Sequence, residues 1–277
     1  MAVVDQMERF AGQFGKRLVV NGVPWRYYRL GAGAPVLWLT GGLRRAALGF
    51  AFMERLAARH TVIAPDYPPV RTIEEFMIAF DSILRTEGVD TFAVVGQSYG
   101  GMLAQAYLAH RPTDVHRLIL SSAGPADYSR AWLPAEKLFI TLARVLPERT
   151  LKDLLAAGLL RLLRAGQLPE VDRTEMAELV STTVHKDLCR ADVVSHFAVA
   201  ADLIRSQVVT PASFQGWNGR IFVLRAENDP SQSKNDIARY QRLFGRRVKV
   251  ISLGRLGHAA VLADPNAYAD QLEQALA

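Results

Sequence analysis

Short apolar runs alternate along the chain with longer segments in which apolar residues recur at helical spacing. Turn-forming residues bound each apolar run, as is typical of strands buried on both faces of a parallel sheet. The helical segments between them predict helices that cover such a sheet on both sides. The predicted strands span residues 18–20, 25–30, 35–39, 61–64, 91–95, 117–120, 221–224 and 248–252, and the predicted helices about 47–59, 72–87, 99–110, 234–244 and 259–275.

The start and the middle of the chain depart from this alternation. Asn21-Gly22, between the first two predicted strands, is a dipeptide typical of a tight hairpin turn. From about residue 126 to 215, helical spacing continues without a strand. We therefore predict an α/β fold with a mostly parallel eight-stranded sheet flanked by helices. Its core comprises residues 1–125 and 216–277, and an inserted helical cap comprises residues 126–215.

One predicted cap helix, residues 151–163, carries more leucines than one packing face needs. A stripe at helical spacing is widened by two further leucines, Leu160 and Leu163. Charged residues interrupt the segment, which argues against a membrane helix. We therefore expect it to be packed on two sides or to line an apolar cavity, with Leu160 and Leu163 as candidate pocket residues. The stripe comprises Leu151, Leu154, Leu155, Leu159 and Leu162.

Composition excludes several classes of protein. The 277 residues are 50% hydrophobic and 22% charged, as in an ordinary globular protein. No apolar run approaches the roughly 18 residues that span a bilayer. The first residues lack a basic-then-apolar targeting pattern, so we expect a cytoplasmic protein without stable membrane insertion. The single cysteine, Cys189, rules out an internal disulfide and a multi-thiolate metal site, and we expect it to be partly buried in the cap.

The net charge of +6 raises the question of nucleic-acid binding. The arginines are scattered, and no run of 5–8 basic residues occurs. We therefore expect no nucleic-acid partner.

The chemically informative segment is Gly96-Gln97-Ser98-Tyr99-Gly100, which follows an apolar strand and opens a helical segment. A serine on so tight a strand-to-helix turn projects away from the sheet, and side chains two residues to either side would collide. Gly96 and Gly100 remove those side chains. The following helix N-terminus favours negative charge beside the serine. This context predicts that Ser98 is a nucleophile.

With this motif the sequence resembles the α/β-hydrolase family, and the resemblance covers nearly the whole chain. The family orders its triad as nucleophile, acid and histidine, each after a strand. The resemblance implies that Asp229 is the acid, with Glu227 and Asp127 as lesser alternatives. His258, in a Gly-His segment that opens the last helix, is then the base.

The resemblance also implies an oxyanion hole of two backbone N–H groups. One belongs to Tyr99, the residue after the nucleophile. The other belongs to Gly42, in the Thr40-Gly41-Gly42-Leu43 loop after an apolar strand, with Leu43 as the alternative register. Leu43 is also a candidate pocket residue.

The segment from Pro65 to Arg71 departs from a glycine-rich loop that many family members have after the next strand. Here the chain looks more like the maspardin-like branch, which keeps a non-catalytic scaffold as an alternative. Tyr67 in this segment either lines the mouth of the site or packs the loop. The other histidines are expected in ordinary surface roles; they are His60, His110, His116, His185 and His196.

The function expected from these features is hydrolysis of a carboxylic ester, lactone or thioester through an acyl-enzyme. Hydrolysis of a carbon–carbon bond and cofactor-free perhydrolysis reuse the same site, and a binding module that retains the triad is a further alternative. No metal or organic cofactor is implied. The expected partner is a small apolar acyl substrate, and the sequence leaves a homodimer open.

Overall fold

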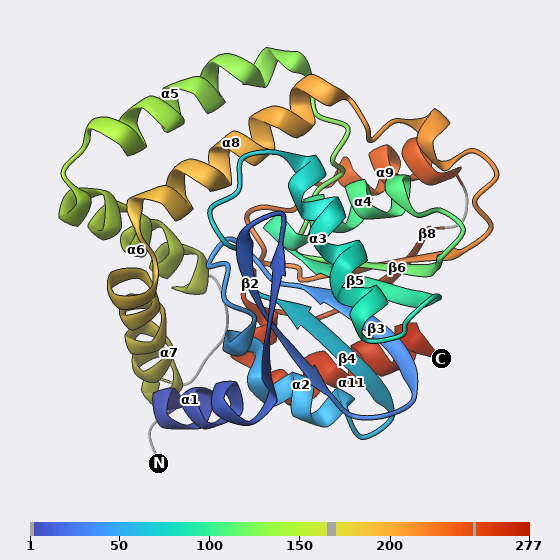
Figure 1. Cartoon of the computed structure of the whole chain (residues 1–277), viewed down its shortest axis with the longest axis horizontal. Coiled ribbons are helices and arrows are strands. Elements are labelled where there is room, and N and C mark those ends of the chain that lie inside the picture. Colours follow the sequence, from blue (N-terminus) through green and yellow to red (C-terminus); the bar gives the residue numbers. More distant parts are fainter. Residues whose placement is uncertain (1–2, 165–169, 246–247) are drawn as a thin grey trace.

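An eight-stranded sheet forms the centre of the molecule (Figure 1). The computed structural model describes residues 3–164, 170–245 and 248–277. The strand order is β1-β2-β4-β3-β5-β6-β7-β8, with β2 antiparallel to both of its neighbours and every other pair parallel. The mostly parallel eight-stranded sheet is thus confirmed. Its strands are β1 (Gly15–Val20), β2 (Val23–Leu30), β3 (Ala34–Leu39), β4 (His60–Pro65), β5 (Phe92–Gln97), β6 (Val115–Ser121), β7 (Arg220–Arg225) and β8 (Val248–Ser252).

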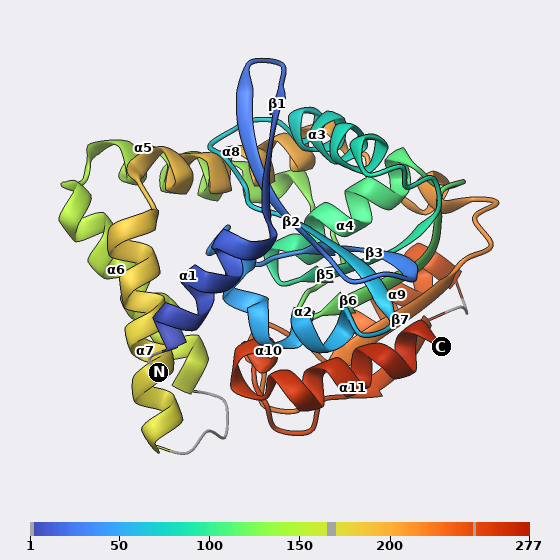
Figure 2. The ribbon, with the colours of Figure 1, turned by 60° about the horizontal axis from the view of Figure 1, so that its bottom comes forward.

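Helices cover both faces of the sheet (Figure 2). Successive strand residues point to opposite faces, so the neighbours Leu37 and Trp38 belong to two different apolar clusters. The first cluster lies under α3 (Ile73–Thr86), α4 (Tyr99–His110) and α9 (Asp236–Phe244). The second lies under α1 (Val3–Phe14), α2 (Phe50–Leu56), α10 (Ala260–Ala263) and α11 (Pro265–Leu276).

The N-terminal part contains a predicted turn and an unpredicted helix. Asn21 and Gly22 have φ angles of 49° and 78°, as a tight hairpin turn between β1 and β2 requires. The helix α1 precedes this hairpin and is anchored by Phe10, whose ring lies 5.4 Å from that of Tyr28. Phe10 is the one α1 residue that is fully buried among those described. Met7, Phe10, Ala11 and Phe14 recur at helical spacing and pack on the same apolar cluster, so the sequence carried a signal for this helix that was not used.

Two predicted helices are each divided. The segment 259–275 forms α10 and α11, because Pro265 has no N–H to continue the first helix. Asp264 caps the second, its carboxylate accepting a hydrogen bond from the Ala267 N–H at 2.9 Å. The segment 47–59 begins as a 3₁₀ turn, Ala46–Gly49, before α2.

Between β6 and β7 the described residues form helices without a strand. We call residues 126–215 the helical insertion; its division from the core as a domain stays a prediction. Helix α8 packs on α5 and α3, and its Asp202 accepts a hydrogen bond from the Ile73 N–H at 2.9 Å. Cys189 is exposed at the start of α8, so its predicted burial is wrong. The helices are α5 (Leu133–Val145), α6 (Glu148–Arg164), α7 (Glu170–Thr182), a π-turn (Thr183–Asp187) and α8 (Arg190–Ser206).

None of the helices in the described ranges is long and apolar enough to cross a membrane.

Candidate active site

Ser98 occupies a strained turn between β5 and α4. Its φ of 52° and ψ of −116° lie in a region that residues with a side chain rarely adopt, at a cost of about 1–3 kcal/mol. A Cβ atom on Gly96 would lie 2.5 Å from the Gly100 carbonyl oxygen, and one on Gly100 would collide with the Leu39 carbonyl. Both glycines are therefore required by the close approach of backbone around the serine.

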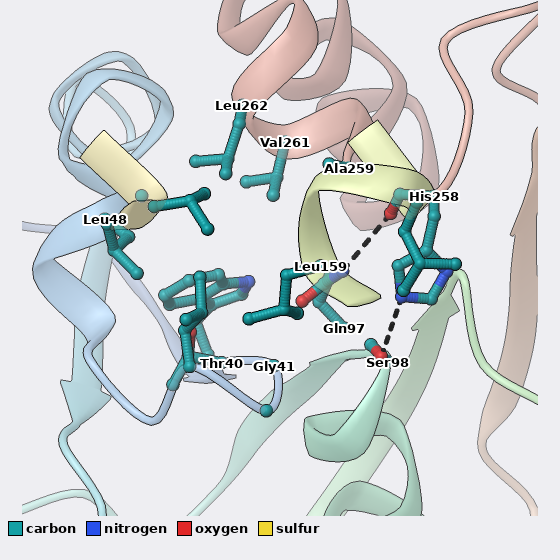
Figure 3. Close-up of a pocket in the computed structure, with 16 residues that line it drawn as sticks. Thr40, Gly41, Leu48, Gln97, Ser98, Leu159, His258, Ala259, Val261 and Leu262 are labelled. Atoms are coloured by element: carbon teal, nitrogen blue, oxygen red, sulfur yellow. Dashed lines mark hydrogen bonds between the residues drawn. The ribbon is translucent and has the colours of Figure 1, made fainter. Parts of the chain in front are cut away.

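Ser98, His258 and Asp229 form one hydrogen-bonded chain. The Ser98 Oγ lies 2.9 Å from Nε2 of His258 (Figure 3), and Nδ1 of His258 lies 3.0 Å from Oδ1 of Asp229. Asp229 follows β7 and His258 follows β8, so residues 160 and 29 positions apart meet at the carboxyl edge of the parallel strands. This arrangement can move a proton from the serine hydroxyl to the imidazole.

A second serine, Ser231, completes the surroundings of the acid. Its N–H and its hydroxyl donate to Oδ1 of Asp229 at 2.9 and 2.7 Å, and its Oγ lies 2.8 Å from Nδ1 of His258. Burial alone would raise the pKa of Asp229, but the hydrogen bonds from His258 and Ser231 lower it below its usual value. Asp229 is therefore ionised at neutral pH. Ser231 lies only two residues beyond Asp229 and was not predicted from the sequence.

The other two candidate acids lie elsewhere. Asp127 forms an ion pair with Arg239 on α9. Glu227 is exposed. Of the three carboxylates, the structure brings Asp229 to His258.

The loop after β3 packs against the serine turn. A Cβ atom on Gly41 would collide with the side chain of Gln97, and Gly42 lines the same cavity as Ser98. Tyr99 is the first residue of α4, so its N–H has no acceptor within the helix. Gly42 and Tyr99 thus flank the serine, and their roles as oxyanion donors stay a prediction, as does the Leu43 register.

An apolar cavity of about 70 Å³ opens beside Ser98 (Figure 3). Leu43 lines it as expected from the sequence. Two leucines of α6, Leu159 and Leu162, close it from the insertion. The core contributes further apolar side chains, among them Trp38, Leu48, Val261 and Leu262.

The structure does not place Leu160 or Tyr67 in the wall of this cavity, and it does not describe the side chain of Leu163. Leu160 lines neither this cavity nor its neighbour and packs in a cluster with Val180 of α7; Leu159 packs on the same cluster but also lines the cavity. Tyr67 is fully buried and donates a hydrogen bond to the Thr40 carbonyl at 2.9 Å, so it packs the loop. The side chain of Leu163 lies outside the described residues.

His196 does not have the surface role expected of it. Its ring stacks on that of Tyr99 at 4.2 Å, and its Cε1 would lie 3.0 Å from a Cβ atom on Gly42. Burial and the charge of Arg44 lower its pKa to about 3, so it is neutral at physiological pH. His60 is also buried, 3.2 Å from Glu273.

Two other histidines pair with carboxylates near the surface, His110 with Asp81 and His185 with Asp153. Among the residues that the structure describes, no cluster of three or more His, Cys, Asp or Glu side chains could hold a metal ion.

Solved structures with similar folds have different functions. A thermophilic esterase from Thermogutta terrifontis is 17% identical, with 95% of this chain and 97% of that chain covered and a TM-score of 0.75. An enol-lactonase from Burkholderia xenovorans LB400 is 16% identical, with coverages of 94% and 99% and a TM-score of 0.72. A variant of a meta-cleavage product hydrolase is 19% identical, with coverages of 95% and 98% and a TM-score of 0.71.

The curated proteins contain no match to the sequence. Residues 19–271 match the sequence model of the alpha/beta hydrolase family. This match covers most of the chain, and the neighbouring structures share its fold. The chain belongs to the alpha/beta hydrolase family.

Proposed function

We propose that this protein is a serine hydrolase that cleaves a carboxylic ester or a related acyl bond. The observation that carries the proposal is the hydrogen-bonded chain from Ser98 through His258 to Asp229, with distances of 2.9 and 3.0 Å. A serine hydroxyl is a weak nucleophile by itself, and a base within hydrogen-bond reach activates it.

In the proposed mechanism Ser98 Oγ attacks the substrate carbonyl carbon while His258 Nε2 takes its proton. The buried carboxylate of Asp229 holds the imidazole in the tautomer with hydrogen on Nδ1 and stabilises the imidazolium that forms. The N–H groups of Tyr99 and Gly42 stabilise the oxyanion. His258 then gives its proton to the leaving group, and water activated by the same imidazole releases the acyl group.

The lining of the cavity favours a substrate with an apolar acyl chain. Apolar side chains line most of the space beside Ser98, which suits the acyl chain of an ester, lactone or thioester. Carbon–carbon bond hydrolysis and perhydrolysis need the same nucleophile, so a substrate panel must distinguish them.

A fluorophosphonate probe tests the nucleophile directly. We expect rapid labelling of the wild-type protein at Ser98 and none of the Ser98→Ala variant. A panel of acyl esters, lactones, thioesters and diketones then identifies the bond. An unlabelled wild-type protein that turns over no member of the panel would support the binding-module alternative and overturn the proposal.

A further inference from the structure

A second cavity adjoins the first, and charged and imidazole side chains outside the triad form part of its wall. It shares Ser98 and His258 with the apolar cavity and is roughly three times larger, about 220 Å³ against about 70 Å³. Leucines and Phe197 form part of its wall, and so do three polar side chains, Arg44, Asp192 and His196. A substrate attacked by Ser98 therefore has two adjoining spaces for its two arms, and the larger one has these three polar side chains in its wall.

Two of these polar residues are engaged with the protein. The Arg44 Nη2 donates to the Pro68 carbonyl at 2.7 Å and to Ser195 Oγ at 2.9 Å, and Arg44 Nε lies 3.5 Å from Asp192. Asp192 also accepts a hydrogen bond from the Cys189 N–H at 3.0 Å. Both side chains are buried, with exposed fractions of 1% and 5%. Arg45 Nη2 also lies 3.6 Å from Asp192, so two guanidinium groups share this one carboxylate.

His196 and Nη1 of Arg44 are polar groups of this wall without a hydrogen bond in the described part of the chain, but Nη1 is enclosed by protein atoms whereas His196 is accessible. Its ring is held by stacking on Tyr99 and by contact with Gly42, and it is only partly buried. Within the described part of the chain, neither ring nitrogen of His196 makes a hydrogen bond. A neutral imidazole has one N–H donor and one nitrogen acceptor. These nitrogens are not among the fully buried unpaired polar atoms, so solvent reaches them, and a ligand group that enters the cavity could replace that solvent.

We propose that His196 is the polar anchor of a substrate subsite that takes a neutral hydrogen-bonding group, a carbonyl or a hydroxyl, on one arm of the acyl substrate. The inference rests on the proposed function, because the subsite is defined by its distance from the reacting serine. A neutral imidazole would bind such a group through one uncharged hydrogen bond, donated by its N–H or accepted by its other nitrogen. A purely packing role of His196 against Tyr99 is the competing explanation.

Two pairs of esters test the subsite. Phenyl hexanoate and phenyl 5-oxohexanoate differ in the acyl arm, and hexyl acetate and 5-oxohexyl acetate differ in the alcohol arm. We expect the wild-type protein to prefer the keto member of one pair by about tenfold in kcat/KM, the effect of one buried hydrogen bond. His196→Phe keeps a ring on Tyr99 without the hydrogen bond, and should reduce this preference to within about twofold.

His185→Phe is the matched control, since His185 is an exposed histidine of the same insertion. It should retain the full preference. His196→Leu provides a second variant without a hydrogen bond, and thermal unfolding checks that each variant folds. Equal turnover of both members of each pair by the wild type, or a preference that survives in both His196 variants, would overturn the subsite. If Ser98 is still labelled by a fluorophosphonate, either outcome leaves the proposed function intact. If the wild-type protein is neither labelled nor active on any ester, the proposed function itself is rejected.

Discussion

In the proposed mechanism Ser98 and His258 act on the same proton, so their removal should not have additive effects. We expect Ser98→Ala to fold normally and to lose roughly 10³–10⁶ in kcat, and His258→Ala to lose a similar amount. The double variant should be little slower than either single variant, because each change already disables the same step. Steady-state kinetics of the three variants checks this. Losses that multiply would contradict a joint role of two groups 2.9 Å apart.

Asp229 should affect kcat by holding the His258 imidazole in the reactive orientation and tautomer. Asp229→Asn can donate to Nδ1 and so favours the wrong tautomer, and we expect kcat to fall by about 10⁴ with little change in structure. Asp127→Asn and Glu227→Gln are matched controls, because these side chains lie away from His258, and each should cost less than about tenfold. A severe loss in Asp127→Asn with an active Asp229→Asn would place the acid after β6 instead.

The α6 helix should determine the response to substrate chain length. Leu159→Asp or Leu162→Asp places a carboxylate in the wall of the apolar cavity, where an acyl chain gains about 0.8 kcal/mol per buried methylene. We expect the octanoate-to-acetate ratio of kcat/KM to fall by about tenfold or more. Leu154→Asp is the control, since Leu154 lies on the same helix and is 60% exposed.

A chain-length profile that Leu159→Asp and Leu162→Asp leave unchanged, with a lowered melting temperature, would show that these leucines contribute to packing alone.

The elements that the sequence predicted best are those with the most regular patterns. The β5 strand is apolar from Phe92 to Val95, and the glycine–serine turn that follows is dictated by local sterics, so both the strand and Ser98 could be predicted from a few residues. It was less predictable which leucines of α6 face the cavity. Leu159 and Leu160 are equally apolar, and only the packing of α7 and the core around the helix decides which of them faces the cavity.

Contacts between distant parts of the chain explain what the sequence could not predict at the site. His196 reaches Tyr99 because α8 packs over the core, partly through Asp202 and Ile73. Ser231 has no motif of its own, and its importance follows from where its hydroxyl lies relative to Asp229. A local pattern therefore predicts a residue such as Ser98, while a residue that acts by long-range contact needs the folded structure.

The buried carboxylate of Asp66, in the loop after β4, should make the stability of the whole molecule depend on pH. Its carboxylate accepts hydrogen bonds from the Ala46 N–H at 2.6 Å and the Tyr28 hydroxyl at 3.2 Å. Burial raises its pKa to about 6, although these bonds and the charges of Arg45 and Arg26 oppose the rise. A raised pKa means that the folded state binds this proton more tightly than the unfolded state. The stabilisation from protonated Asp66 is thus complete below about pH 4 and is lost as pH rises through about 6.

Asp66→Asn should remove this pH dependence, because the amide stays neutral. A shift of about two pKa units corresponds to about 3 kcal/mol. The free energy of unfolding of the variant minus that of the wild type should therefore increase by about 2 kcal/mol between pH 4 and pH 7.5, most of the full effect. Other carboxylates titrate alike in both proteins and largely cancel in the difference. Urea unfolding at several pH values measures it, and a difference that stays constant would show that Asp66 remains ionised throughout this range.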